Sequence, residues 1–407
     1  MRIIQNALRM AAGMAAATAL LLSPAPVNAQ SRDANSREPV KLGVLLPLTG
    51  PGALSSQGFM LAIRMAVKEI NDSGGLLGRR VELVLADDQL DPTQSITEAR
   101  RLTQQERVNF VLGPLGSALA AAVAPVMNDT KTLYLSSAVA PAPSVYNFSV
   151  TMSAVSQASS MTRFMAQDLK VKSAAILQDN GGACKALNEE YKRLLPQNGI
   201  ELKAVREHEF RPSDVTPQLL ALRRTEPDIL IQCSTTGDDA GLVIKNLSDI
   251  GWNIRYVSIA AAQATFNTLK TGGPDAFKSG RYYGLLPKAY TYCAGEKPGG
   301  RNYDRYLARL KAFDPDMFEK VDQKNSLYMY DGIQLLRAAV EATKSFDNTT
   351  LVAWMEENGK NVRGVAGFPF ATSKAHHFLM GDDSLTYVNH PDVVRPEDKF
   401  VQRDIGC

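Results

Sequence analysis

The chain has 407 residues, of which 45% are hydrophobic and 21% are charged, and its formal net charge is +3. This composition predicts a well-packed globular protein rather than a disordered one, and the length suits two α/β lobes better than one core. The small net charge, with no basic cluster interleaved with aromatic residues, argues against a nucleic-acid partner.

The first 29 residues have the pattern of a cleaved secretory signal peptide. Arg2 and Arg9 accompany an apolar run over Met10–Leu22, and small residues at Val27–Ala29 form a cleavage site. The apolar run is shorter than the roughly 20 residues that a membrane-spanning helix needs. Cleavage would remove two arginines and no acid, which lowers the net charge from +3 to +1. We therefore expect a periplasmic protein, with residues 30–39 as a flexible leader.

Strands and helices are expected to alternate from Val40 onward. Val40–Leu46 is a compact apolar run typical of a buried parallel strand, whereas Phe59, Ile63 and Val67 recur at helical spacing. The same criteria predict strands at 81–86, 110–112 and 133–135, and helices at 92–105 and after 117. This β-α-β-α order predicts an open parallel sheet with helices on both faces.

The alternation restarts after a polar stretch at 153–160, which predicts a second unit of the same architecture. Strands are expected at 174–177, 200–205, 228–232 and 256–259, with helices at 185–195, 215–224 and 240–250. Further helices are expected at 303–313, 326–343 and 351–357, before an irregular, turn-rich end. The fold class is thus α/β, with two lobes that each hold an open, largely parallel sheet.

Four cysteines follow the signal peptide: Cys184, Cys233, Cys293 and Cys407. An even number in an oxidising compartment predicts two disulfides, with three possible pairings. Four free thiols are the alternative. The spacing of these cysteines fits no zinc site, because no two are close in sequence and none has a histidine nearby.

Several segments together resemble the branched-chain amino-acid-binding (Leu/Ile/Val-binding, type I) family of periplasmic proteins, which serve ABC importers. These segments are 41–44, 48–51, 69–80, 87–92, 330–332 and 370–377. The resemblance implies a two-lobed fold in which the chain crosses between lobes three times. It places 40–155 and 285–363 in lobe one, 156–284 and 364–395 in lobe two, and 396–407 in a C-terminal tail. It also implies the pairings Cys184–Cys233 and Cys293–Cys407.

A carboxylate site is expected where two strands of lobe one end. Ligands of open parallel sheets lie beyond the C-terminal strand ends, where helix N-termini present backbone N–H groups to anions. In relatives of this kind a serine and backbone groups of the next loop hold the ligand's carboxylate. The matching positions are Ser117, Ala138 and Ala140. The alternative is an ordinary serine at a helix start beside a tight loop.

Lobe two departs from the family pattern, because Ala260 stands where amino-acid binders keep an acid for the ligand's ammonium group. A buried ammonium without an anionic partner costs several kcal/mol. We therefore expect a ligand with a carboxylate and no α-amino group, such as an aromatic or short aliphatic acid. Asp179 or Asp238 could instead supply the negative charge. The remaining expected ligand-binding residues are Asn180, Thr235, Gln263 and Ser55.

Enzyme signatures are absent from the sequence, which has no Gly-x-Ser-x-Gly elbow, no phosphate-binding Gly-Lys-Ser/Thr loop and no His-Glu-x-x-His helix. The adjacent His376 and His377 would point to opposite faces of a strand, so a structural role is expected for them. We expect a monomeric binding protein without cofactor, metal or catalytic residues, whose partners are a small organic anion and importer permease subunits. A ligand-sensing subunit of a membrane receptor is an alternative.

Overall fold

The computed structural model describes residues 38–234, 237–258, 265–273, 281–321, 323, 326–395 and 400–407. The expected signal peptide and most of the expected leader lie outside the described residues. Among the helices that are described, none is long and apolar enough to cross a membrane.

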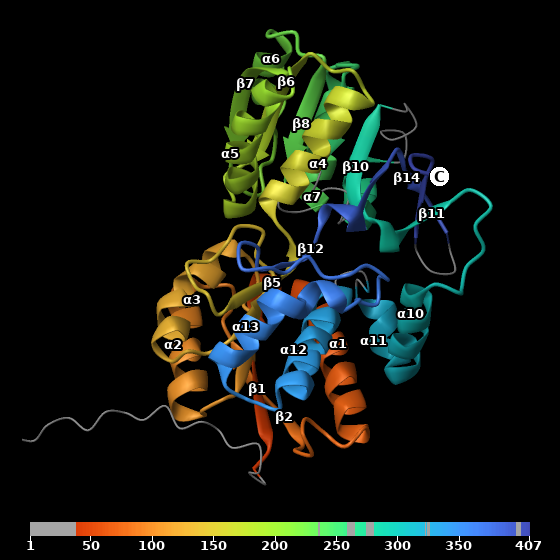
Figure 1. The fold of residues 1–407 in the computed structure, drawn as a ribbon. Helices are drawn as coiled ribbons and strands as arrows, with labels where there is room; N and C mark the ends of the chain where they lie inside the picture. The colour runs from red at the N-terminus through yellow and green to blue at the C-terminus, as the bar shows by residue number, and fades with distance from the viewer. Residues whose placement is uncertain are drawn as a thin grey trace, which may run out of the picture. The chain divides into compact units, whose positions relative to one another are not determined.

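The first sheet has six strands in the order β12-β5-β4-β3-β1-β2 (Figure 1). Its strands are β1 (Val40–Leu46), β2 (Val81–Asp87), β3 (Phe110–Leu112), β4 (Tyr134–Ser136), β5 (Asn147–Met152) and β12 (Phe378–Met380). Every neighbouring pair in this sheet is parallel. The C-terminal ends of these strands therefore meet at one edge, where a ligand site is expected.

The second sheet also has six strands, in the order β13-β10-β9-β8-β6-β7. Its strands are β6 (Ser173–Asp179), β7 (Glu201–His208), β8 (Ile229–Cys233), β9 (Arg255–Ser258), β10 (Tyr282–Pro287) and β13 (Leu385–Val388). Its pairs are parallel except that β13 runs antiparallel to β10. The expected two-lobed fold with largely parallel sheets is thus confirmed.

The helices begin largely where the sequence predicts them. Asp91 caps α2 by accepting a hydrogen bond from the Gln94 N–H at 2.8 Å, and a π-helical turn extends that helix to Gln105. The polar stretch at 153–160 folds as the start of α4, with Ser153 as its cap. The helices are α1 (Ala53–Asp72), α2 (Pro92–Arg100), α3 (Ser117–Asp129), α4 (Ala154–Gln167), α5 (Gly182–Gln197), α6 (Thr216–Arg223), α7 (Gly237–Asp249), α9 (Thr265–Gly272), α10 (Asn302–Phe313), α11 (Pro315–Lys320), α12 (Ser326–Thr343) and α13 (Asn348–Asn358).

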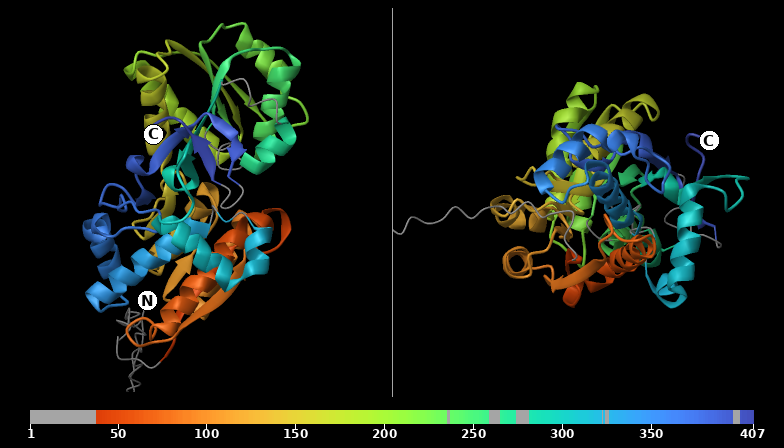
Figure 2. Two further views of the ribbon diagram at one scale, coloured as in Figure 1. Left: turned by 90° about the vertical axis from the view of Figure 1, so that its right-hand side faces the viewer. Right: turned by 60° about the horizontal axis from the view of Figure 1, so that its bottom comes forward.

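The late helices pack on the first sheet's layer. The local sequence pattern left their lobe open, and the resemblance implied lobe one. α12 lies against α1, and α10 and α11 lie beside α1 as well (Figures 1 and 2). The Tyr330 hydroxyl donates to Glu69 at 2.6 Å and accepts a hydrogen bond from Arg309 at 3.0 Å. These contacts tie α12, α1 and α10 together.

Both expected disulfides are present. Cys184–Cys233 joins the first turn of α5 to the end of β8 and is buried, whereas Cys293–Cys407 joins two distant parts of the chain. The second disulfide flanks a small sheet of β11 (Thr291–Cys293), β15 (Val401–Arg403) and β14 (His390–Val394).

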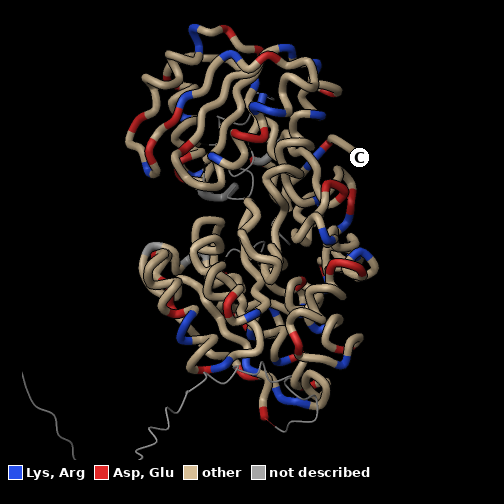
Figure 3. The backbone as a smooth tube through the Cα atoms, turned by 60° about the vertical axis from the view of Figure 1, so that its left-hand side comes forward, with Lys and Arg blue, Asp and Glu red and all other residues tan. Residues whose placement is uncertain are grey.

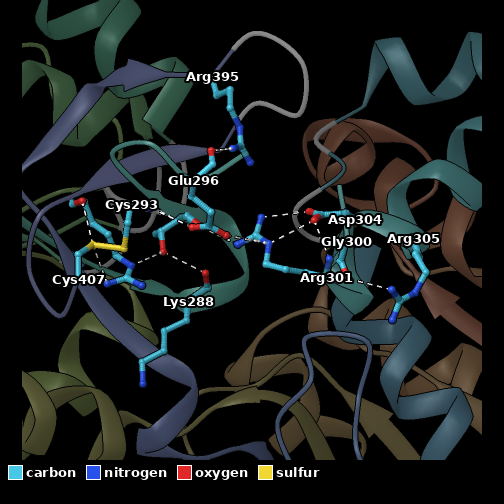
Figure 4. A network of polar contacts seen from close by, with 11 residues as sticks. Lys288, Cys293, Glu296, Gly300, Arg301, Asp304, Arg305, Arg395 and Cys407 are labelled. Carbon is cyan, nitrogen blue, oxygen red and sulfur yellow. Dashed lines mark hydrogen bonds and ion pairs between the residues drawn. A yellow bond between two sulfur atoms is a disulfide. The ribbon is translucent and has the colours of Figure 1, made fainter. Parts of the chain in front are cut away.

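A polar network supports this small sheet (Figure 4). Arg301 forms an ion pair with Asp304 at 3.1 Å, and Arg395 donates to the carbonyl of Glu296 at 2.7 Å. The guanidinium of Arg301 also lies 4.5 Å from the ring centroid of Phe400. Arg395 and Arg301 thus connect the region around Glu296 to the C-terminal part of the chain.

Parts of two segments join a different sheet from the one implied by the resemblance. The range 364–395 was expected in lobe two, and its strand β13 does pair with β10 of the second sheet, but its strand β12 pairs with β5 of the first sheet. Residues 285–287 were expected in lobe one, but they complete β10 of the second sheet. Short edge strands are assigned by pairing with distant segments, which a local pattern does not reveal.

Charged residues of both signs are interspersed along the described chain (Figure 3). Many pair with a neighbour on the same helix, as Lys68 does with Asp72 at 2.5 Å and Lys245 does with Asp249 at 2.6 Å. This mixed distribution agrees with the small net charge and suits a soluble surface.

Candidate ligand-binding site

The loop after β3 turns sharply at Gly113. Its φ is 110°, a left-handed value that favours glycine, and a Cβ at this position would lie 1.9 Å from the carbonyl oxygen of Leu45 on the adjacent strand β1. Gly116 then precedes α3 and offers no side-chain cap to the first turn. This loop therefore delivers the start of α3, with uncapped N–H groups, to the C-terminal edge of the sheet.

Ser117 is the first residue of α3, and its hydroxyl joins two strand-end loops. Its Oγ accepts hydrogen bonds from the backbone N–H groups of Val139 at 3.0 Å and Ala140 at 3.1 Å. A serine hydroxyl has two acceptor lone pairs and one O–H donor. The two amides occupy both lone pairs, and no hydrogen bond donated by Ser117 is found within the described residues. The O–H is therefore available to an external acceptor.

Two hydroxyl groups of β5 hold the loop after β4 in place. Ala138 is buried, and its carbonyl accepts hydrogen bonds from Ser149 and, at 2.8 Å, from Thr151. No hydrogen bond from the Ala138 N–H is found among the described residues. The structure thus brings Ser117, Ala138 and Ala140 together, with the N–H of Ala140 already bound to Ser117.

Three further residues shape this loop pair and were not expected from the sequence. The Ser137 hydroxyl accepts a hydrogen bond from the Gly116 N–H at 3.3 Å, and Ser149 and Thr151 hold Ala138 from β5. Ser137 could have been proposed from the sequence, because it lies just after a predicted strand. Ser149 and Thr151 carried no such signal, because β5 was not predicted.

In the second sheet, Asp179 is the last residue of β6 and Asn180 follows it, and both side chains make structural contacts. Asn180 is exposed, and its side-chain oxygen accepts a hydrogen bond from the Phe210 N–H at 3.2 Å. Asp179 is fully buried and accepts from the Gly181 N–H at 2.9 Å. Asn180 therefore anchors the loop after β7, and Asp179 shapes the turn into α5.

Asp238 is exposed in the first turn of α7, where it accepts a hydrogen bond from the Thr271 hydroxyl at 3.1 Å. It is the better placed of the two candidate charges, because it is open to a ligand. Thr235, Ala260 and Gln263 lie outside the described residues. Ser55 falls within α1, but its side chain is likewise outside what the structure describes.

The adjacent histidines take structural positions. His377 stacks on Phe148 with ring centroids 4.2 Å apart, and its Nε2 lies 2.8 Å from a carboxylate oxygen of Glu356. Burial lowers the pKa of His376. Among the described residues, no group of three or more His, Cys, Asp or Glu side chains could hold a metal ion.

Comparisons with known proteins agree with this architecture. The chain is similar to the Leu/Ile/Val-binding protein BraC3 of Rhizobium johnstonii, with 24% identity over 360 residues that cover 84% of this chain and 88% of the relative. It also resembles the solved structure of a solute-binding protein of an ABC transporter from R. palustris in complex with 4-hydroxybenzoate. That likeness has a TM-score of 0.70 and 19% identity, and it covers 90% of this chain and 96% of the other.

A third similar structure is the branched-chain amino acid transporter substrate-binding protein from Streptococcus pneumoniae in complex with isoleucine. It has a TM-score of 0.68 and 16% identity, and the match covers 85% of this chain and 97% of the other. At these identities the structural likenesses show the fold alone. The family model described as "Periplasmic binding protein" matches residues 39–389. The chain therefore belongs to the periplasmic binding protein family.

Proposed function

We propose that the protein is an extracytoplasmic solute-binding protein that captures a small carboxylate between its two lobes and delivers it to an ABC importer. The observation that carries this proposal is the position of Ser117. Its hydroxyl accepts two backbone N–H groups and keeps its own O–H for an external acceptor. Together with the uncapped start of α3, this arrangement favours an anion.

The ligand that we favour has a carboxylate and no α-amino group, such as a benzoate or a short aliphatic acid. Ala260 stands where an acid would be needed for an ammonium group. Asp179 is buried and accepts a hydrogen bond from the Gly181 N–H, so the exposed Asp238 is the remaining candidate for such a charge. The R. palustris relative in complex with 4-hydroxybenzoate supports this class of ligand. The relatives named as Leu/Ile/Val-binding proteins support the alternative, an amino acid.

Binding is coupled to hinge closure in this proposal. The carboxylate docks first on Ser117 and the Ala138 N–H of lobe one, and lobe two then closes over the rest of the ligand. The ligand contacts both lobes only in the closed state, and this difference in affinity drives closure. Lobe one comprises the first sheet and lobe two the second, with crossovers at the segments that link them.

The protein acts by binding alone and needs no cofactor, and the importer supplies the energy for transport. The signal peptide proposed for residues 1–29 directs it to the periplasm. Its partners are then the ligand and the permease subunits, which would recognise the closed pair of lobes.

A thermal-shift screen of the mature protein tests the ligand class. One panel holds benzoate, 4-hydroxybenzoate and short aliphatic acids, and the other holds branched-chain and polar amino acids. A ligand at 100 times its dissociation constant adds about 2.7 kcal/mol to the free energy of unfolding, which gives a clear shift. Each hit is repeated with Ser117→Ala, so that only hits weakened by the substitution are assigned to the site between the lobes.

We expect that hits sensitive to Ser117→Ala come from the acids. Sensitive hits from the amino acids alone would contradict the proposed ligand class and leave the binding function intact. If no hit from either panel depended on Ser117, the proposed carboxylate site would be wrong.

A further inference from the structure

Within the described residues, the chain passes between the layers of the two large sheets three times. The first passage joins β5 to α4, the second joins β10 to α10 by way of β11, and the third joins β12 to β13. A hinge between two lobes is made of a few such segments, and any further link between the lobes restricts its motion. The small sheet β11-β15-β14 is a further link of this kind.

The small sheet is attached to the second sheet's layer through the chain and through packing. β14 begins at His390, directly after β13 ends at Val388, and β11 begins at Thr291, shortly after β10 ends at Pro287. β15 also lies against β13, and β14 lies against α9. The small sheet therefore belongs with lobe two.

Aromatic contacts attach the same small sheet to the first sheet's layer. Phe400, just before β15, is 1% exposed and stacks on Tyr303 of α10 with ring centroids 5.6 Å apart. Arg301, at the start of α10, lies 4.5 Å from the Phe400 ring centroid and donates to the first carbonyl of β11 at 2.8 Å. Tyr290, just before β11, contacts Tyr303 and also Tyr328 of α12. Because α10 and α12 pack beside α1, the small sheet contacts both lobes.

The disulfide Cys293–Cys407 closes a covalent ring through both lobes (Figure 4). Cys293 is the last residue of β11, and Cys407 is the last residue of the chain, 114 positions later. The segment between them includes α10 and α12 of the first sheet's layer and β13 of the second sheet, so it contains the second and third passages. A cross-link of this kind restricts the segment that it encloses. The disulfide Cys184–Cys233 differs, because it joins α5 to β8 within lobe two.

We propose that the small sheet and the disulfide Cys293–Cys407 form a hinge brace, which limits how far the two lobes separate in the ligand-free protein. The disulfide keeps the end of the chain on β11, and β15 in turn keeps Phe400 on Tyr303. Wide opening would have to pull these two rings apart, because one is fixed to each lobe. The brace goes beyond the proposed function, since it acts without a ligand. For any ligand, a hinge restricted beforehand loses less conformational entropy on closure.

Electron paramagnetic resonance of the ligand-free protein tests the brace by measuring distances between the lobes. Asp129 of α3 and Glu189 of α5, both exposed, are replaced with p-acetylphenylalanine and spin-labelled there, so that no cysteine is altered. In the variant Cys293→Ser/Cys407→Ser, the distribution of label distances should broaden about twofold and its mean should become longer, because the ring is opened.

Two further variants control this experiment. Cys184→Ser/Cys233→Ser also removes a disulfide, but one that lies within lobe two, so the distribution should match that of the otherwise unsubstituted protein. Phe400→Leu keeps both disulfides and loses the ring stack on Tyr303, so it should broaden the distribution in the same direction. It tests the brace even if the variant without Cys293 and Cys407 does not fold.

The proposal is overturned if folded Cys293→Ser/Cys407→Ser or Phe400→Leu gives the distribution of the unsubstituted protein. It is also overturned if Cys184→Ser/Cys233→Ser broadens the distribution as much as either of them, because loss of stability would then explain the effect. No ligand is present in these measurements, so a failure of the proposed carboxylate site would leave their outcome unchanged.

Discussion

The carboxylate of Asp331, buried in α12, accepts a hydrogen bond of 2.8 Å from the backbone N–H of Val365. This bond fixes the segment that leads from α13 back toward the sheets. The contact is close, because a Cβ at Gly364 would lie 2.1 Å from Asp331 Oδ2. The Tyr330-Asp331-Gly332 motif is therefore explained by packing: Tyr330 binds Glu69, Asp331 binds Val365, and Gly332 lies against Val150.

Burial raises the pKa of Asp331 from 3.8 to about 7. The native state then binds this proton more tightly than the unfolded state does. The stabilisation is complete below about pH 4 and is lost as the pH rises through 7, which amounts to a loss on the order of 2 kcal/mol between pH 5 and pH 8. In Asp331→Asn the free energy of unfolding, measured with urea, should decline less between these two pH values.

The control for this prediction is Asp316→Asn, which changes an exposed carboxylate in α11. It should show the same decline between pH 5 and pH 8 as the unsubstituted protein. An undiminished decline in Asp331→Asn would contradict the raised pKa.

Gly113 is expected to tolerate no side chain. Alanine there would require a left-handed backbone and would place a Cβ 1.9 Å from the Leu45 carbonyl oxygen. Gly113→Ala should therefore lower the free energy of unfolding by about 3 kcal/mol or more. Gly182→Ala is the matched control, because it begins α5 with no atom within 4 Å of the added Cβ. It should be neutral or stabilise by about 0.5–1 kcal/mol in the same urea titration.

The two disulfides should differ in their access to reductant. Cys184 and Cys233 are 1% and 3% exposed, whereas Cys407 is exposed. Under mild reductant without denaturant, alkylation followed by mass spectrometry should find Cys293 and Cys407 labelled first. Equal labelling of all four cysteines in the folded protein would contradict this order.

Removing the buried disulfide Cys184–Cys233 should lower the free energy of unfolding. The Cys184→Ala/Cys233→Ala variant removes a link across 49 residues. We expect it to lower the free energy of unfolding by about 2–4 kcal/mol, measured by urea denaturation. No measurable loss would show that the link does not constrain the unfolded chain.

Much of the fold was predictable because its signals are local. Val40–Leu46 and Phe110–Leu112 are buried apolar runs bounded by turns, and α12 matches its expected range of 326–343. The strands β5, β10, β12 and β13 of the two large sheets were not predicted. β12 and β13 are short and β5 is rich in polar residues, and the sheet membership of these strands depends on partners far away in sequence.

The candidate site was predictable only in part for the same reason. Ser117 could be found because it follows a predicted strand and a glycine-containing loop. Its two amide donors, Val139 and Ala140, lie more than twenty residues away and approach it only in the folded sheet.

The most direct test of the central claim is calorimetric titration of the mature protein and Ser117→Ala with the best acid from the screen. Ser117 supplies the proposed O–H donor to the ligand's carboxylate, so its loss should weaken binding by about 1–3 kcal/mol. Ser248→Ala, an exposed serine on α7, should bind as the unsubstituted protein does. Equal affinity of all three proteins for the acid would contradict the assignment of Ser117 to the carboxylate site.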